Sequence, residues 1–177
     1  APTDSAVLIL GETGTGKELL ARAIHRLSAR GDAPFVPFNC GTSTPEMLDS
    51  ELFGHERGAF TGAASTRAGL ARQAHQGTLF LDEIAELPSI AQPELLRLVD
   101  SGEMRSVGSD EFERVDIRLL SATHQDLAAA ATAGRFREDL LFRLSTFRLR
   151  LPPLRQRLED LPILIEYFTA DARQRGY

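Results

Sequence analysis

A glycine-rich heptapeptide near the amino end constrains this chain more than any other feature. Residues 11–17 follow the G-x-x-x-x-G-K pattern of loops that cradle nucleotide phosphates. An apolar run at 6–10 precedes the loop, and apolar residues at 20, 24 and 27 follow it with helical spacing. Backbone N–H groups and the amino end of a helix together bind phosphate oxygens in this context. We therefore predict a nucleotide triphosphate site formed by Gly11, Glu12, Thr13, Gly14, Thr15, Gly16 and Lys17.

Lys17 is the only lysine in the chain, and every other Lys-or-Arg position is arginine. The two residues are not interchangeable at a compact phosphate site, where lysine acts as a point charge. A lysine kept at this position favours contact with the outer phosphates over the alternative of a glycine-rich turn with a surface lysine.

Composition limits the class of protein. The 177 residues suffice for one domain with a sizeable core, and 42% hydrophobic and 25% charged content is ordinary for a globular protein. A net charge of −5 disfavours a general nucleic-acid-coating surface. The single Cys40 excludes an internal disulfide and fits a reducing compartment. With neither a membrane-spanning run nor a signal peptide, we expect a cytoplasmic protein without membrane contact.

Apolar strand patterns alternate with helical ones along the chain, which predicts an α/β fold with a parallel sheet flanked by helices. A capping-box pattern, Ser89 to Gln92, is expected to open the helix before Gly102. The expected strands are 5–10, 34–40, 78–81, 117–123 and 147–151. The expected helices are 17–29, 44–54, 68–75, 88–102, 126–133, 136–144 and one from 160, with a hairpin over 104–115. Residues 1–151 form the predicted nucleotide-binding core, and Pro152-Pro153 opens a linker to a second segment, 152–177.

Two acids follow the apolar strand at 78–81, as a nucleotide-hydrolysis site requires. Asp82 is predicted to hold Mg²⁺ through its water shell, and Glu83 to polarise the attacking water. The alternative is that both acids only cap the next segment.

Residues 55–65 have neither helical nor strand periodicity and contain three small-residue breakers around one large apolar side chain. They predict a protruding loop with Phe60 at or near its tip. The alternative is that Phe60 folds back onto the body.

Five segments in collinear order carry a resemblance to a known family. They are GETGTGKE at 11–18, ELFGHERGAFTGA at 51–63, GTLFLDEI at 77–84, FREDLLFRL at 136–144 and LPPLRQR at 151–157. The chain resembles the central AAA+ ATPase domain of the bacterial sigma-54-dependent transcriptional activators, also called enhancer-binding proteins. The resemblance covers nearly the whole chain and implies an AAA+ P-loop NTPase fold with the start of a helical lid at 152–177.

The resemblance implies roles for further residues. The loop that contacts sigma-54 would be Gly58, Ala59, Phe60, Thr61, Gly62 and Ala63, with Phe60 and Thr61 its working residues. Asn39 would hydrogen-bond Glu83 and relay the nucleotide state, although a strand-end cap is the alternative. Thr123 and His124 stand at the sensor position, where the family often has Thr-Asn. Arg137 and Arg143 match two candidate arginine fingers, for which a surface salt bridge is the alternative.

Two departures from common patterns are informative. Glu18 stands where most phosphate loops carry a Mg²⁺-binding Ser or Thr, and the family commonly has Glu there. Gln76 stands where the family usually has Gly, and we expect a local loop adjustment.

The whole resemblance implies an ATP- and Mg²⁺-dependent ring, most often a hexamer, that remodels the sigma-54 RNA polymerase holoenzyme. DNA contact would come only from a separate domain outside this chain. The rest of the helical lid would also lie outside this chain. Two alternatives remain open: a degenerate regulator that binds nucleotide without remodelling sigma-54, and a monomeric P-loop enzyme such as a small-molecule kinase.

Overall fold

Five parallel strands form the central sheet of the computed structural model, which describes residues 4–174. Their order is β2-β5-β8-β1-β9, and each strand runs parallel to its neighbours. The bounds are β1 Val7–Leu10, β2 Phe35–Asn39, β5 Thr78–Asp82, β8 Arg118–Thr123 and β9 Phe147–Arg150. Because the strands are parallel, their carboxyl ends meet at one edge, where loops from β1, β5 and β8 come together. The predicted parallel α/β architecture is confirmed.

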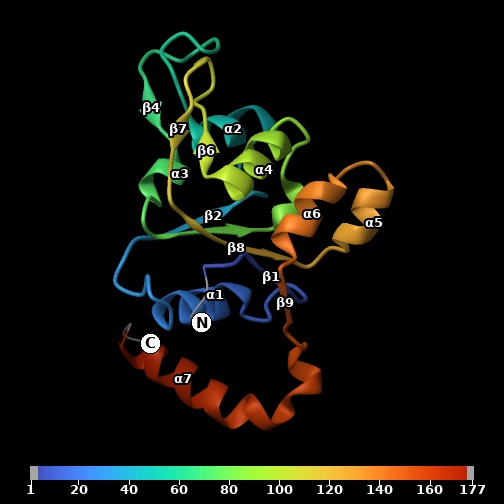
Figure 1. The fold of residues 1–177 in the computed structure, drawn as a ribbon. Helices are drawn as coiled ribbons and strands as arrows, with labels where there is room; N and C mark the ends of the chain where they lie inside the picture. The colour runs from blue at the N-terminus through green and yellow to red at the C-terminus, as the bar shows by residue number, and fades with distance from the viewer. Residues whose placement is uncertain (1–3, 175–177) are drawn as a thin grey trace.

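Helices lie on both faces of the sheet (Figure 1), and because successive strand residues point to opposite faces, the sheet has a core on each side. Ile9, Phe80 and Leu120 pack against α1 (Lys17–Arg26) on one face. Leu8, Leu79 and Leu119 belong to the larger core on the other face. That face is covered by α2 (Pro45–Phe53), α3 (Leu70–Gln73), α4 (Gln92–Ser101) and α6 (Glu138–Leu144), with α5 (Leu127–Thr132) beside α6.

Two small hairpins rise from the α2 and α4 side, at the top of Figure 1. One joins β3 (Gly54–His55) to β4 (Arg67–Ala68), and the other joins β6 (Glu103–Met104) to β7 (Glu113–Arg114). A bridge between His55 and Val107 connects them, and Glu56 N–H donates to Val107 O at 3.0 Å. The hairpin predicted over 104–115 is confirmed.

After β9 the chain leaves the sheet through two short 3₁₀ turns, Leu154–Gln156 and Leu158–Asp160. The last helix, α7 (Leu161–Gln174), then runs along the lower side of the molecule, apart from the sheet (Figure 1). Large apolar side chains of α7 are exposed, among them Ile163, Ile165 and Phe168. The predicted domain limits, 1–151 and 152–177, include residues 1–3 and 175–177, which lie outside the described range.

Several predicted boundaries change. α1 ends at Arg26 rather than at 29, and Leu27, expected on its apolar face, is the exposed C-cap residue. The predicted capping box is wrong: α4 begins at Gln92, which is buried and bonds to other parts of the fold. Gln76, where a glycine was expected, has a left-handed backbone with φ of 60°. Such a φ favours glycine, so the departure places strain in this turn.

Among residues 4–174, none of the helices combines the length and the apolar character that a bilayer span needs.

Candidate functional site

The phosphate loop lies at the carboxyl end of β1, as its pattern predicts. Gly11 N–H donates to Thr123 O at 3.3 Å, which ties the start of the loop to β8. Gly14 and Gly16 have positive φ values of 81° and 94°, so the loop curls as only glycine does without strain. Lys17 is the first residue of α1 and is 7% exposed, with its Nζ 3.1 Å from Gly11 O. The lysine therefore lies folded into the loop that it is predicted to serve.

Glu83 connects the three strand ends. Its Oε1 lies 3.6 Å from Lys17 Nζ. Its Oε2 lies 2.8 Å from His124 Nδ1 and accepts a 3.4 Å hydrogen bond from Thr123 Oγ1. The strand order makes this possible, because β8 lies between β5 and β1. Glu83 also has a left-handed backbone, with φ of 51°. Strained backbone of this kind is characteristic of functional positions.

The pKa values of the two acids are shifted in opposite directions. Burial raises the pKa of Asp82, and the neighbouring Glu83 charge adds to that effect. Burial also acts to raise the pKa of Glu83, but the His124 hydrogen bonds and the Lys17 charge outweigh it and lower the pKa. Glu83 is thus held ionised, as a group that polarises water must be.

Asp82 suits a magnesium ion. One carboxylate oxygen accepts Glu83 N–H at 3.0 Å. Burial is the largest cause of its raised pKa and the charges of Glu83 and Glu18 add to it, so a bound cation would favour the ionised carboxylate. Mg²⁺ keeps several waters and needs only one or two carboxylates together with substrate phosphates, so Asp82 fits this role. Glu18, on the first turn of α1, pairs instead with Arg22 at 2.7 Å on the surface.

Asn39 does not make the expected bond to Glu83 in this structure. Its Oδ1 accepts Gly41 N–H at 2.8 Å, so the side chain caps the end of its own strand. The carboxylate of Glu83 is occupied by Lys17 and His124. The contact predicted from the resemblance is therefore absent between these two described residues, and the strand-end cap is the geometry observed.

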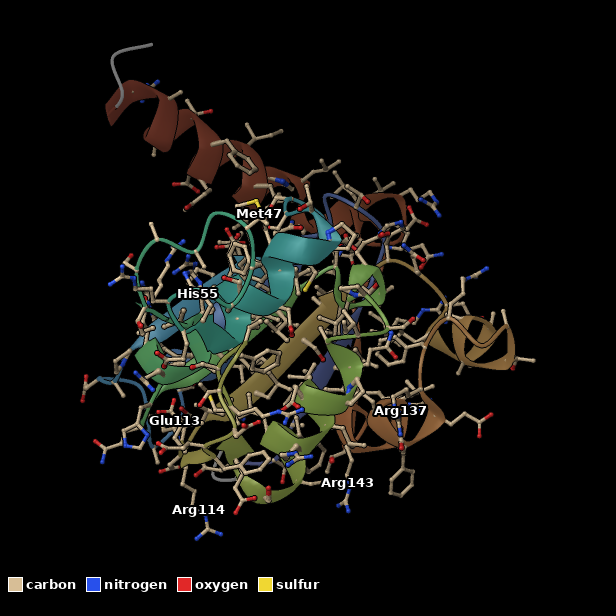
Figure 2. The ribbon with its side chains drawn as sticks, turned by 90° about the horizontal axis from the view of Figure 1, so that it is seen from above. Met47, His55, Glu113, Arg114, Arg137 and Arg143 are labelled. Atoms are coloured by element: carbon tan, nitrogen blue, oxygen red, sulfur yellow. The ribbon has the colours of Figure 1, made fainter. Side chains whose placement is uncertain are left out.

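Arg137 and Arg143 lie at the α6 edge of the molecule (Figure 2). Arg137 is the N-cap residue of α6, and its guanidinium pairs with Asp139 at 2.8 Å. Arg143 pairs with Asp100 of α4 at 2.6 Å. Both side chains are about half exposed. Neither belongs to the group of side chains around Glu83, and a surface salt bridge is the geometry observed for both.

The Phe60 loop is anchored at its base. His55 is buried, and its Nδ1 lies 2.7 Å from Ser50 Oγ of α2. The Phe60 ring packs edge-on against the His55 ring with centroids 5.1 Å apart, yet Phe60 remains 43% exposed. The loop thus combines the two alternatives, because Phe60 contacts the body while staying accessible.

Two arginines of the linker reach the phosphate loop, a contact that the sequence patterns did not predict. Arg155 donates to both carboxylate oxygens of Glu12 at 2.8 and 2.6 Å, and Arg157 donates to Thr15 O at 2.7 Å. The LPPLRQR segment forms part of the resemblance. Arg157 and Thr15 are 142 positions apart in the sequence, however, and local patterns do not predict contacts between such distant residues.

A parallel sheet with a phosphate loop after β1, paired acids at the end of β5 and the polar pair Thr123 and His124 at the end of β8 has the architecture of an AAA+ P-loop NTPase. Solved structures of NtrX from Brucella abortus share this fold. The complex with ADP has a TM-score of 0.91 and 41% identity over 99% of this chain and 38% of that one. The complex with ATP has a TM-score of 0.90 at the same identity and coverage.

The Sigma-54 interaction domain family matches residues 1–150, and the chain belongs to that family. It is 52% identical over 176 residues to the transcriptional regulatory protein ZraR of Salmonella typhimurium. It is 51% identical over 166 residues to the response regulator protein PilR of Pseudomonas aeruginosa. The matches cover 99% and 94% of this chain but only 40% and 37% of those proteins. The chain therefore spans about two fifths of the length of these relatives.

Proposed function

We propose that the chain hydrolyses ATP and uses the reaction to move the Phe60 loop against sigma-54, so that the closed RNA polymerase complex opens. The observation that carries the proposal is the position of Glu83, with Lys17 Nζ at 3.6 Å and His124 Nδ1 at 2.8 Å. A carboxylate held ionised beside the phosphate loop is suited to polarise a water molecule. Membership of the Sigma-54 interaction domain family supports the choice of partner.

Each residue of the site has a defined task in this reaction. The loop from Gly11 to Glu18 binds the phosphates, with Lys17 at the outer ones, and Glu83 takes up a proton from the attacking water. Asp82 holds Mg²⁺, which when bound neutralises charge that develops on the phosphates. Thr123 and His124 report the outer phosphate to Glu83, because both already contact its Oε2. Asn39 joins this relay only if its side chain leaves Gly41.

The site is completed by a second subunit of a ring, most simply a hexamer. Arg137 and Arg143 lie outside the group around Glu83 and are exposed, which suits guanidinium groups that enter a neighbour's site. An arginine supplied in trans accelerates phosphoryl transfer on the order of 10³-fold or more. The ring acts in the cytoplasm, where its polymerase partner is, and DNA is bound by a separate domain.

The output end is the loop Gly58, Ala59, Phe60, Thr61, Gly62 and Ala63. It is anchored through His55 to α2 and through the His55–Val107 bridge to the second hairpin. These contacts join it to the body of the nucleotide-binding core, so a change near Glu83 can be transmitted to it. A degenerate regulator has no need for this full set of hydrolytic and loop residues.

Two substitutions in the complete protein test the proposal. Glu83→Ala should bind ATP normally but release phosphate at least about 100-fold more slowly, since the base is lost. Thr61→Ala should hydrolyse ATP at nearly the normal rate yet fail to bind sigma-54 or form open complexes. Phosphate release and promoter opening are measured in parallel. Wild-type turnover by Glu83→Ala would exclude Glu83 as the base, and normal opening by Thr61→Ala would exclude the loop as the sigma-54 contact.

A further inference from the structure

Gln92, the first residue of α4, has an unusual environment for a helix-start residue. It is 1% exposed, and its amide makes three hydrogen bonds to backbone groups of other segments. Nε2 donates to Leu87 O and to Arg135 O, both at 3.0 Å. Oε1 accepts Arg137 N–H at 2.9 Å. Both amide hydrogens and the oxygen are used, so the orientation of the side chain is fixed by its partners.

Two of these bonds bracket the residue before Arg137. Arg135 O and Arg137 N–H are held by the same amide, and Phe136 between them is buried. Arg137 is the N-cap residue of α6, where backbone N–H groups lack helical partners. The Arg137 side chain itself makes no capping hydrogen bond to this helix. Gln92 therefore fixes the backbone from which the Arg137 side chain extends.

The Arg137 side chain is held loosely. It is 47% exposed, and its guanidinium pairs only with Asp139 among the contacts of the described residues. An exposed ion pair of this kind contributes little stability. The Arg137 side chain, here called the arm, can thus leave Asp139 while the Arg137 backbone stays anchored to α4 through Gln92. Arg143 has the opposite arrangement, because α4 contacts its guanidinium through Asp100 rather than its backbone.

We propose that Gln92 is the positioning residue for Arg137, and that it sets where this guanidinium enters the nucleotide site of the neighbouring subunit. The inference rests on the proposed shared ATP site. Gln92 touches neither nucleotide nor reacting water, and acts only through Arg137. A misplacement of about 1 Å at a catalytic group lowers rates on the order of 100-fold, so loss of this anchor should be visible in turnover.

The test uses mixtures of complete variant proteins. Lys17→Ala subunits lack a working site but keep the arm, and Arg137→Ala subunits keep the site but lack the arm. Gln92→Met removes all three hydrogen bonds with little change in shape. Alone, it should lower kcat on the order of 100-fold with nearly unchanged KM for ATP. Mixed with Lys17→Ala it should recover activity, because its intact site receives a normal arm. Mixed with Arg137→Ala it should not.

Two controls make each outcome decisive. The mixture of Lys17→Ala with Arg137→Ala must recover activity; if it does not, the shared site fails before Gln92 is in question. Gln73→Met makes the same chemical change at an exposed position of α3 and should keep normal turnover. Gln92→Asn keeps the amide on a shorter side chain. Like Gln92→Met, it should recover activity with Lys17→Ala but not with Arg137→Ala, and its kcat should fall less. It replaces Gln92→Met in the test if that variant does not fold.

Three results would overturn the proposal while leaving the shared site intact. The first is wild-type turnover by Gln92→Met. The second is recovery with Arg137→Ala as large as recovery with Lys17→Ala. The third is failure of both folded Gln92 variants to recover with either partner, which would make Gln92 a residue for folding alone.

Discussion

At the scale of one residue, the surroundings of Glu83 favour its ionised carboxylate. Burial alone would raise its pKa, but the hydrogen bonds from His124 and the Lys17 charge reverse the shift. A base whose pKa is lowered stays ionised to lower pH, so hydrolysis should persist into mildly acidic solution. The acid limb of the rate profile therefore reports on the contact between His124 and Glu83.

Replacing His124 should move that limb. In His124→Ala the hydrogen bond from the imidazole is lost while the backbone N–H of residue 124 can still donate, so the pKa of Glu83 should rise and kcat should begin to fall at higher pH than in the wild type. His124→Asn is the matched variant, because an amide can still donate to Oε2, and its profile should lie nearer to the wild type. The measurement is kcat at saturating ATP across acidic pH. Coinciding acid limbs for His124→Ala and the wild type would show that His124 does not tune Glu83.

Motifs and strand positions, and for Thr123 and His124 the family resemblance, predicted which side chains come together at the strand ends. Lys17, Glu83, Thr123 and His124 are close together because a parallel sheet gathers the carboxyl ends of its strands. Sequence did not reveal which partner each polar group takes. Asn39 bonds to Gly41, within its own turn, and Gln92 bonds to a segment more than 40 residues away. Both hydrogen bonds depend on side-chain rotamers in the packed structure, and local sequence patterns do not predict these rotamers.

The two hairpins behave as a pair at the scale of elements. Gly108, between β6 and β7, has φ of 82°, and a Cβ placed there would lie 2.8 Å from Ala59 Cβ. The second hairpin thus approaches the Phe60 loop as closely as a glycine permits. This contact supports the loop at Ala59, next to the bridge between His55 and Val107, and limits the positions that the loop can take.

Gly108→Ala should separate the hairpins. The left-handed backbone costs about 1 kcal/mol for alanine, and the clash with Ala59 displaces the loop further. We expect a modest loss of thermal stability, nearly normal ATPase activity and strongly reduced sigma-54 binding. Gly134→Ala is the control, because Gly134 also has a positive φ, of 71°, but a Cβ added there would meet nothing within 4 Å. Equal sigma-54 binding by the two variants would mean that contact between the hairpins is unimportant for the loop.

Elements with strong periodicity were predicted well, and irregular ones were not. All five sheet strands lie where apolar runs placed them. The expected helix at 68–75 shrinks to the four residues of α3, because Gly69 and the turn through Gln76 bound it on both sides. The start of α4 was misplaced since Gln92, which resembles a capping residue in sequence, serves a tertiary contact.

Distant parts of the chain are joined at the scale of the whole molecule by Arg30. Its side chain is 12% exposed and bonds to Asp4 at 2.8 Å, to Asp116 at 2.6 Å and to Gly77 O at 3.2 Å. These contacts connect the segment after α1 to those before β1, β5 and β8. They close the end of the sheet that lies opposite to the phosphate loop.

Arg30→Met should destabilise the fold by about 2 kcal/mol at neutral pH, because the part-buried Gly77 O and the carboxylates of Asp4 and Asp116 lose a charged donor. Hydrogen bonding to Arg30 lowers the pKa of Asp4, although burial opposes it. Because the pKa of Asp4 is lower in the folded than in the unfolded state, the ionised carboxylate stabilises the fold when the pH is above the unfolded-state pKa. This stabilisation is lost as the pH falls through the folded-state pKa. The difference in the free energy of unfolding between the wild type and Arg30→Met should therefore become smaller below about pH 4.

Denaturant unfolding at neutral and acidic pH measures this difference. Arg72→Met, which removes an exposed ion pair with Glu113, should cost less than about 1 kcal/mol and serves as the control. A difference that stays constant with pH would assign the effect of Arg30 to packing rather than to its carboxylate partners.

The pairing of Arg137 with Asp139 and of Arg143 with Asp100 has a consequence for assembly. Neither guanidinium is a bare charge, so in the proposed ring its contact with a neighbour's phosphates would exchange one anion for another. The carboxylate left behind would lose its positive partner, and its own negative charge would no longer be compensated. Binding of the guanidinium to the neighbour's phosphates and release of Asp139 or Asp100 would then be coupled. A subunit that donates an arginine would in this way carry a local charge that depends on whether its neighbour holds a triphosphate.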